Sequence, residues 1–333
     1  MKQLFQTAVL DNNTFKSLWQ QFFSNQLTDT QKTVLLSYCN WETLNQTQHR
    51  LIYMAWAESR TAWDWIGNQT VVDFNVGVST NPNGHIYSLA TALLLAGVGV
   101  PVVKTGDYGY GNYCGYSDIL EYLGAKFART STDWRTSLEK TSFAYVHAPN
   151  AHRTLDALRT IRTDMGATTV LDTLQPLANV QTGVQLVVGA QTLSQQQYYN
   201  QLTTAAGGDV SILYDLSDAP CMTLAHDWQW TRDHYTETLL LSDWGLPTYS
   251  DNILHADNKK TVAEASDCLL RLLNENGSEA ENMVLIVNTA FVLQNLMPTL
   301  NMAGALAEAE ASLVSGRALQ VLERLLSATL TKA

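Results

Sequence analysis

Short, β-branched apolar runs recur through the middle of the chain, and longer segments of helical spacing separate them. The runs are predicted to be buried strands because they are short and contain few polar residues. Strands that alternate with helices form a mainly parallel sheet flanked by helices on both faces. We therefore predict an α/β fold with strands at residues 70–78, 100–104, a segment after Gly124, 143–148, 168–174, 184–190 and 210–216.

Residues 1–66 have a different pattern, in which apolar residues recur at helical spacing. One stripe runs from Phe15 to Phe23, and Thr28 with Gln31 has the spacing of a capping box at a helix N-terminus. The C-terminal third is predicted to be helical again. We predict a small N-terminal helical domain, 1–66, joined by helices from about 152–166, and a larger α/β domain, 67–333.

The charge balance limits the partners of the chain. The 333 residues include 20 Lys and Arg against 31 Asp and Glu, which gives a net charge of -11. Nucleic-acid binding rests on basic side chains that neutralise phosphates, so this balance argues against a nucleic-acid partner. The four cysteines lack the paired spacing of a zinc knuckle or a disulfide framework. Without a signal-like N-terminus or a membrane-spanning apolar run, we expect a cytoplasmic protein and no membrane partner.

Three loops follow predicted strands, at residues 79–85, 105–117 and 149–153, and all are rich in Gly, Asn, Ser or His. In open α/β sheets, ligands bind beyond the carboxyl ends of the strands, so we expect a small-molecule ligand in a cleft there. The second loop belongs to KTGDYGYGNYCGYSD, Lys104 to Asp118, in which glycine alternates with tyrosine. Its rings are expected either to line a pocket for a flat ligand, to contact a protein partner, or to stack in a surface loop.

The order of the segments resembles that of anthranilate phosphoribosyltransferases. The resemblance is carried by GVPVVKTGD, GYSDILEYLGAKF, HAPNAH, IRTDMGATTVLDTLQPLANV and SGRALQVLERLL, and it extends over essentially the whole chain. It implies a nucleoside-phosphorylase-type glycosyltransferase fold, a cleft between two domains and a homodimer formed through the helical domain. It also implies that phosphoribosyl pyrophosphate binds on the α/β side with magnesium, and that anthranilate enters from the helical side.

The resemblance assigns candidate site residues. The acceptor candidates are Asp107, His152 and Arg162, and Arg162 matches the arginine that faces the anthranilate carboxylate. Lys104 and Arg162 each have a local alternative, as a solvated lysine at a strand end and a surface helix residue. For Ser88 the alternative is a polar residue of its own helix, and for His152 it is a polar residue of its own turn. The candidates for the donor and its phosphates are Gly77, Ser79, Thr80, Ser88, Lys104, Gly106 and Asn112.

Several positions depart from the family pattern where the family holds phosphate and metal. The glycine-rich first loop is replaced by residues 76–80, VGVST, whose β-branched side chains obstruct a close approach to phosphate. The acidic pair that holds magnesium falls on Pro220 and Cys221, which supply no carboxylate oxygen. Asp215 and Asp218 lie nearby and substitute only if the loop is remodelled. We therefore predict no metal-ligating residues, with magnesium as a cofactor only if transferase activity is retained.

Different classes of function follow from these patterns, and the sequence leaves open whether the chain is an enzyme. One is a pentosyl transferase of the tryptophan-biosynthesis type with eroded donor and magnesium motifs and an altered acceptor. Another is a divergent, non-catalytic paralogue that binds a small ligand or a protein partner. A nucleic-acid-binding relative is disfavoured by the charge of -11. A nucleoside phosphorylase that uses free phosphate needs no acidic pair, and it rests on Lys104 and Ser88.

Overall fold

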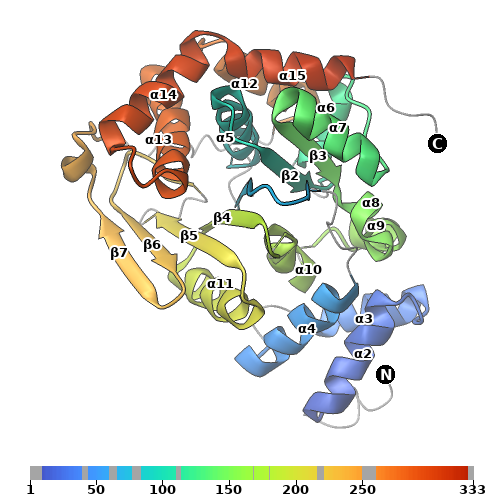
Figure 1. Cartoon of the computed structure of the whole chain (residues 1–333). Helices are drawn as coiled ribbons and strands as arrows, with labels where there is room; N and C mark the ends of the chain where they lie inside the picture. The colour runs from blue at the N-terminus through green and yellow to red at the C-terminus, as the bar shows by residue number, and fades with distance from the viewer. Residues whose placement is uncertain are drawn as a thin grey trace.

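A seven-stranded sheet in the order β3-β2-β1-β4-β5-β6-β7 forms the centre of the molecule (Figure 1). The computed structural model describes residues 10–39, 44–59, 66–76, 84–109, 114–167, 169–179, 181–215, 221–249 and 260–328. β1 to β5 pair in parallel, and β6 and β7 continue the sheet in antiparallel pairing. The predicted α/β class is therefore confirmed. The strands are β1 Val71–Val76, β2 Val102–Gly106, β3 Phe143–His147, β4 Val184–Ala190, β5 Asp209–Asp215, β6 Trp228–Arg232 and β7 Tyr235–Leu239.

Helices cover both faces of this sheet (Figure 1). No described helix combines the length and the apolarity that crossing a bilayer requires. In the described part of the chain the helices are α2 Asn12–Phe23, α3 Asp29–Tyr38, α4 Gln46–Ser59, α5 Gly84–Val98, α6 Tyr116–Tyr122, α7 Ser131–Thr141, α8 Ala148–Ala151, α9 Arg153–Met165, α10 Val170–Leu174, α11 Leu193–Ala206, α12 Val262–Leu273, α13 Glu279–Leu296, α14 Met302–Val314 and α15 Arg317–Ser327, with the 3₁₀ helices η2 Gln175–Leu177 and η3 Leu241–Trp244.

The helices form two layers with different cores. α5 and the C-terminal helices α12 to α15 share one apolar core with β1 and β2. On the opposite face, α10 and α11 share a core with β4, β5 and the N-terminal helices. Because every residue of β1 to β4 is buried, these strands are short runs rich in apolar residues and do not alternate between apolar and exposed polar positions. This burial explains why short β-branched runs identify them in the sequence.

The N-terminal helices turn their apolar stripes inward. Phe15, Trp19 and Phe22 of α2 are 2% exposed or less, and they pack in the same core as α4. The predicted capping box of Thr28 and Gln31 begins α3. The hydroxyl of Thr154, at the start of α9, donates a hydrogen bond to the carbonyl oxygen at the end of α2. α9 therefore attaches to the N-terminal helices, while the division into two domains stays a prediction.

Three predicted elements are wrong. The strand predicted at residues 168–174 is wrong, because α10 occupies Val170–Leu174 with every side chain buried. Residues 124–130 follow α6 without forming the predicted strand. The C-terminal third is not wholly helical, since β6 and β7 form a hairpin around a turn in which Asp233 has a φ of 53°. The first error has a simple cause, since a short apolar run fits a buried helix as well as a strand.

Candidate functional site

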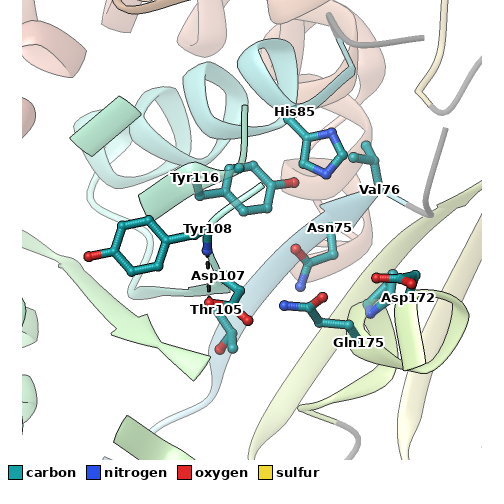
Figure 2. Close-up of a pocket in the computed structure, with 12 residues that line it drawn as sticks. Asn75, Val76, His85, Thr105, Asp107, Tyr108, Tyr116, Asp172 and Gln175 are labelled. Atoms are coloured by element: carbon teal, nitrogen blue, oxygen red, sulfur yellow. Dashed lines mark hydrogen bonds between the residues drawn. The ribbon is translucent and has the colours of Figure 1, made fainter. Parts of the chain in front are cut away.

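A pocket opens beyond the carboxyl ends of β1 and β2 (Figure 2). Here the strand order changes direction, since the connection from β1 leads to β2 and that from β4 leads to β5 on the other side. Such switch points are where open α/β sheets bind ligands. The pocket is narrow: about 30 Å³ inside it is open to a water-sized molecule, and its empty volume reaches about 400 Å³ when the open mouth is included. Its described lining takes nothing from α2 to α4 and consists of Asn75, Val76, His85, Thr105, Gly106, Asp107, Tyr108, Gly115, Tyr116, Asp172, Gln175 and Pro176.

Asp118 joins the two described ends of the segment between β2 and α6. Its carboxylate accepts hydrogen bonds from the backbone N–H of Gly109 at 2.6 Å and of Gly115 at 2.8 Å. A Cβ on Gly115 would lie 2.2 Å from the carbonyl oxygen of Asp107, so this close approach requires glycine. The two ends of the loop thereby bring Tyr108 and Tyr116 to the same side of the pocket (Figure 2).

Lys104 lies buried beneath this wall, with no exposed surface. Its Nζ donates hydrogen bonds to the carbonyl oxygen of Phe74, to Asn75 Oδ1 at 2.9 Å and to Ser88 Oγ at 2.7 Å. Its Nζ also lies 4.1 Å from the centre of the Tyr116 ring. Three acceptors match the three donors of an ammonium group, so Lys104 is held as a cation although burial lowers its pKa. The alternative of a solvated lysine at the strand end is wrong.

Asp73 supplies the countercharge for Lys104. Its Oδ2 accepts hydrogen bonds from the amides of Asn75, at 2.8 Å, and of Asn179. The Asn179 amide also donates to Thr105 Oγ1 at 2.6 Å. Burial raises the pKa of Asp73, and the positive charge of Lys104 opposes that rise. The Asn75 amide therefore bridges the two charges, and the network ties β1 to β2 under the pocket.

Arg162 lies between two carboxylates at the other end of the pocket. Its Nη2 is 2.5 Å from Asp172 Oδ1, its Nη1 is 3.3 Å from Asp107 Oδ2, and all three side chains are 9% exposed or less. Asp172 is fixed by Thr169, whose backbone N–H and hydroxyl both donate to Oδ2, at 2.6 and 2.9 Å. Burial raises the pKa of Asp107, and the Arg162 guanidinium opposes the rise. The alternative of a surface arginine on α9 is wrong, and two acceptor candidates are brought together.

Aromatic and imidazole rings form the wall between these two ends. The Arg159 guanidinium lies 3.9 Å from the centre of the Tyr108 ring, and the His147 ring packs against the edge of Tyr108 at 5.0 Å. Burial lowers the pKa of His147 to about 4, and Arg159 adds to this effect. His85, 5.0 Å from the Tyr116 ring, also has a pKa lowered by burial to about 4. Both imidazoles are therefore neutral at neutral pH.

The other candidates from the sequence are placed in different ways. Ser88 is buried in the Lys104 network and also accepts a hydrogen bond from the Tyr116 hydroxyl at 3.1 Å. Gly106 lines the pocket, and a Cβ there would lie 2.4 Å from the Tyr116 ring. His152 is outside the lining and packs 5.5 Å from the ring of Trp56 in α4. Outside the described residues lie Gly77, Ser79, Thr80 and Asn112.

The described residues at and after the end of β5, Asp215 and 221 onward, do not fit a magnesium ion. Asp215 is buried, and its Oδ2 accepts hydrogen bonds from the backbone N–H and hydroxyl of Thr223, both at 2.7 Å, and from Trp228 Nε1 at 3.0 Å. Burial raises the pKa of the Cys221 thiol, so it is not a thiolate. Asp218 lies outside the described residues. Among the residues that the structure does describe, no cluster of His, Cys, Asp or Glu has the arrangement of a metal site.

Several lining residues are absent from the sequence-based candidates. Asp172 lies in the segment predicted as a strand, 168–174, and Gln175 is the first residue after that segment. The spacing of Thr169 and Asp172, which is that of a capping box, was a detectable sign of a helix start. His85 and Asn75 carry no motif of their own, because only the fold brings the start of α5 beside the end of β1.

The comparisons with known proteins agree with this architecture. A model described as the glycosyl transferase family, a/b domain, matches residues 69–319. The anthranilate phosphoribosyltransferases of Cytophaga hutchinsonii and Bacteroides thetaiotaomicron are 26% and 28% identical over 237 residues, which cover 71% of this chain and 72% and 71% of those proteins.

Solved structures extend the likeness to the whole fold. The anthranilate phosphoribosyltransferase of Thermus thermophilus has a TM-score of 0.78 at 18% identity, over 98% of both chains. The Saccharomyces cerevisiae enzyme in complex with PRPP and Mg has a TM-score of 0.78 at 16% identity, over 98% of this chain and 95% of that one. This chain therefore belongs to the glycosyl transferase family with an a/b domain, as a member of the anthranilate phosphoribosyltransferase family.

Proposed function

We propose that this chain binds a flat small ligand in the pocket of Figure 2 and does not transfer a phosphoribosyl group from magnesium-bound phosphoribosyl pyrophosphate. The observation that carries the proposal is the state of Lys104. Its ammonium group is buried, and its three donors are used by acceptors within the protein. It has no donor left for a phosphate.

The donor end of the pocket supports the same conclusion. A departing pyrophosphate is stabilised by exposed backbone N–H groups, cationic side chains or metal ions. Here the Tyr116 ring covers the Lys104 ammonium, and the neutral His85 imidazole lies beside it. The buried Asp215 and Cys221 give magnesium no ligand set of its usual kind.

The pocket walls suit a flat ligand with polar edges. Tyr108 and Tyr116 offer aromatic surface, while the amides of Asn75 and Gln175 lie opposite (Figure 2). Small-molecule sites commonly combine such apolar walls with a few polar groups that orient the ligand. Of the alternatives for the Gly/Tyr loop, we therefore favour a pocket wall over a protein contact.

Two alternative functions lose support. The phosphorylase hypothesis rests on Lys104 and Ser88, and both are buried and hydrogen-bonded to each other. A nucleic-acid-binding function remains disfavoured by the net charge of -11.

We also propose that any homodimer uses a surface other than the apolar stripes of α2 and α4. Those stripes are buried in the core of the chain, so they are not available to a second copy. A role in tryptophan biosynthesis is proposed only for the case in which transfer survives. The cytoplasmic location and the divergent-paralogue origin also stay predictions.

Thermal unfolding with a panel of ligands tests the proposed function. Adenine, 2-aminobenzamide and benzamidine are each added in the presence and in the absence of magnesium. The shifts in Tm are compared with the shift caused by phosphoribosyl pyrophosphate plus magnesium. We expect at least one ring compound to raise the Tm independently of magnesium, and Tyr108→Ala to remove that shift. Tyr122→Ala, at an exposed tyrosine of α6, is the matched control. A magnesium-dependent shift with phosphoribosyl pyrophosphate, together with consumption of anthranilate, would overturn the proposal.

A further inference from the structure

The end of the pocket formed by Arg162 is acidic. The guanidinium is paired with two carboxylates, those of Asp107 and Asp172, and both of these residues line the pocket. One positive charge therefore meets two negative charges at a site that is nearly closed to solvent. An additional anion placed here finds no unpaired cation, since the nearest one is already shared between two carboxylates.

The charges around the Arg162 end of the pocket do not reverse its negative charge. Arg159 lies over the Tyr108 ring, and its charge favours the ionised forms of Asp107 and Asp118, whose pKa values burial raises and Arg159 lowers. At the other end, Lys104 is offset by Asp73, and the low pKa of His85 leaves that imidazole neutral. With Arg159 counted, the three carboxylates of Asp107, Asp118 and Asp172 still outnumber the two guanidinium groups at this end of the pocket. This contrasts with the role that the family resemblance gives Arg162, which is to face a carboxylate.

The two carboxylates also have hydrogen-bonding capacity left. Each carboxylate oxygen accepts up to about two hydrogen bonds. Asp107 Oδ1 accepts one from the Tyr108 backbone N–H at 2.8 Å, and Oδ2 accepts one from Arg162. Asp107 thus has one vacant acceptor position on each oxygen. A ligand group that donates two parallel hydrogen bonds, such as an amidinium, matches a carboxylate of this kind.

Resting on the proposed function, we propose that the pocket selects a flat ring that carries an amidine-like or other cationic donor group, and that it rejects aryl carboxylates. The ring lies against Tyr108 and Tyr116, and its donor group contacts Asp107. An aryl carboxylate in the same position faces like charge in a poorly solvated site, where such a contact is strongly unfavourable.

Three probes of one ring size test this selectivity by titration calorimetry on the whole chain. Benzamidine is cationic, 2-aminobenzamide is neutral and anthranilate is anionic. We expect affinity to fall in that order, with at least about a tenfold difference between benzamidine and anthranilate. Anthranilate binding more tightly than benzamidine would overturn the selectivity while leaving a ring-binding pocket in place. Failure of every ring compound to bind would overturn the proposed function and this inference with it.

A pair of variants locates the effect at Asp107. Asp107→Asn removes the charge of this carboxylate while keeping the size of the side chain, and we expect it to reduce the ratio of benzamidine to anthranilate affinity about tenfold. Asp164→Asn removes the same charge from an exposed position on α9, and the ratio should not change. An equal change in both variants would show a general effect of net charge and contradict the inference. If Asp107→Asn does not fold, the ranking of the three probes on the unmodified chain still decides the question.

Discussion

At the scale of single residues, the pocket depends on two buried cations that are held in different ways. Lys104 donates to three neutral oxygen acceptors and reaches its countercharge, Asp73, only through the amide of Asn75. Arg162 contacts its two carboxylates directly. The hydrogen bonds of Lys104 keep its charge away from a ligand, while the ion pairs of Arg162 leave carboxylate oxygens at the pocket surface. The two ends of the pocket therefore favour different chemical groups.

The burial of Lys104 makes it a stability residue. In Lys104→Met the carbonyl of Phe74 and the Asn75 amide lose a partner, and Asp73 loses its countercharge. We expect the free energy of unfolding to fall by roughly 3–5 kcal/mol, as when one partner of a buried charge pair is removed. Urea denaturation measures this, with the exposed Lys126→Met as the control, which should change stability by less than about 0.5 kcal/mol. Equal stability of the two variants would mean that Lys104 is free to contact a ligand.

At the scale of secondary structure, the sheet was largely predictable, whereas α10, which contributes Asp172 to the pocket, was not. β1, β4 and β5 are buried β-branched runs; the predicted bounds of β4 match the observed ones, and those of β1 and β5 differ by one or two residues. The same composition failed at α10, because a five-residue buried helix has no visible periodicity. The partners of Arg162 were also out of reach. Asp107 is 55 residues away along the chain, and only the fold brings the two together.

Helix α10 begins at a cap that also positions the site. Thr169→Ala removes the hydroxyl that donates to Asp172, so we expect a loss of about 1 kcal/mol of stability and weaker binding of benzamidine. Thr192→Ala removes a comparable cap from α11, away from the pocket lining. It should cost about as much stability and leave binding unchanged. Urea denaturation and calorimetry on both variants separate the two effects. Unchanged binding in Thr169→Ala would contradict a positioning role for Asp172.

At the scale of the whole molecule, the family fold is retained while the charges around its ligand site differ from the family pattern. The chain superposes over nearly its full length on enzymes of the family, at 16–18% identity. Its apolar layers hold the strand ends in place without specifying what they bind, because packing and ligand chemistry depend on different side chains. The fold was therefore inferred from the sequence more securely than the ligand.

Buried neutral histidines make the stability of the molecule depend on pH. The pKa of His147 falls from 6.5 to about 4 on folding, so the unfolded chain binds more protons between these values and stability decreases as the pH falls. Relative to the wild type, His147→Phe should gain roughly 1–3 kcal/mol in free energy of unfolding between pH 6.5 and pH 4. Groups such as Asp73 titrate in both proteins, and their contributions cancel in the difference. A difference that does not vary with pH would show that folding does not lower the pKa of His147.

The most direct test of the central claim is calorimetric titration of the whole chain with phosphoribosyl pyrophosphate, with and without magnesium. Because Lys104 is buried and the described residues at and after the end of β5 do not fit magnesium, we predict no binding at millimolar ligand under either condition. Benzamidine, as the positive control, should bind equally well in both. Magnesium-dependent binding of phosphoribosyl pyrophosphate would contradict the account.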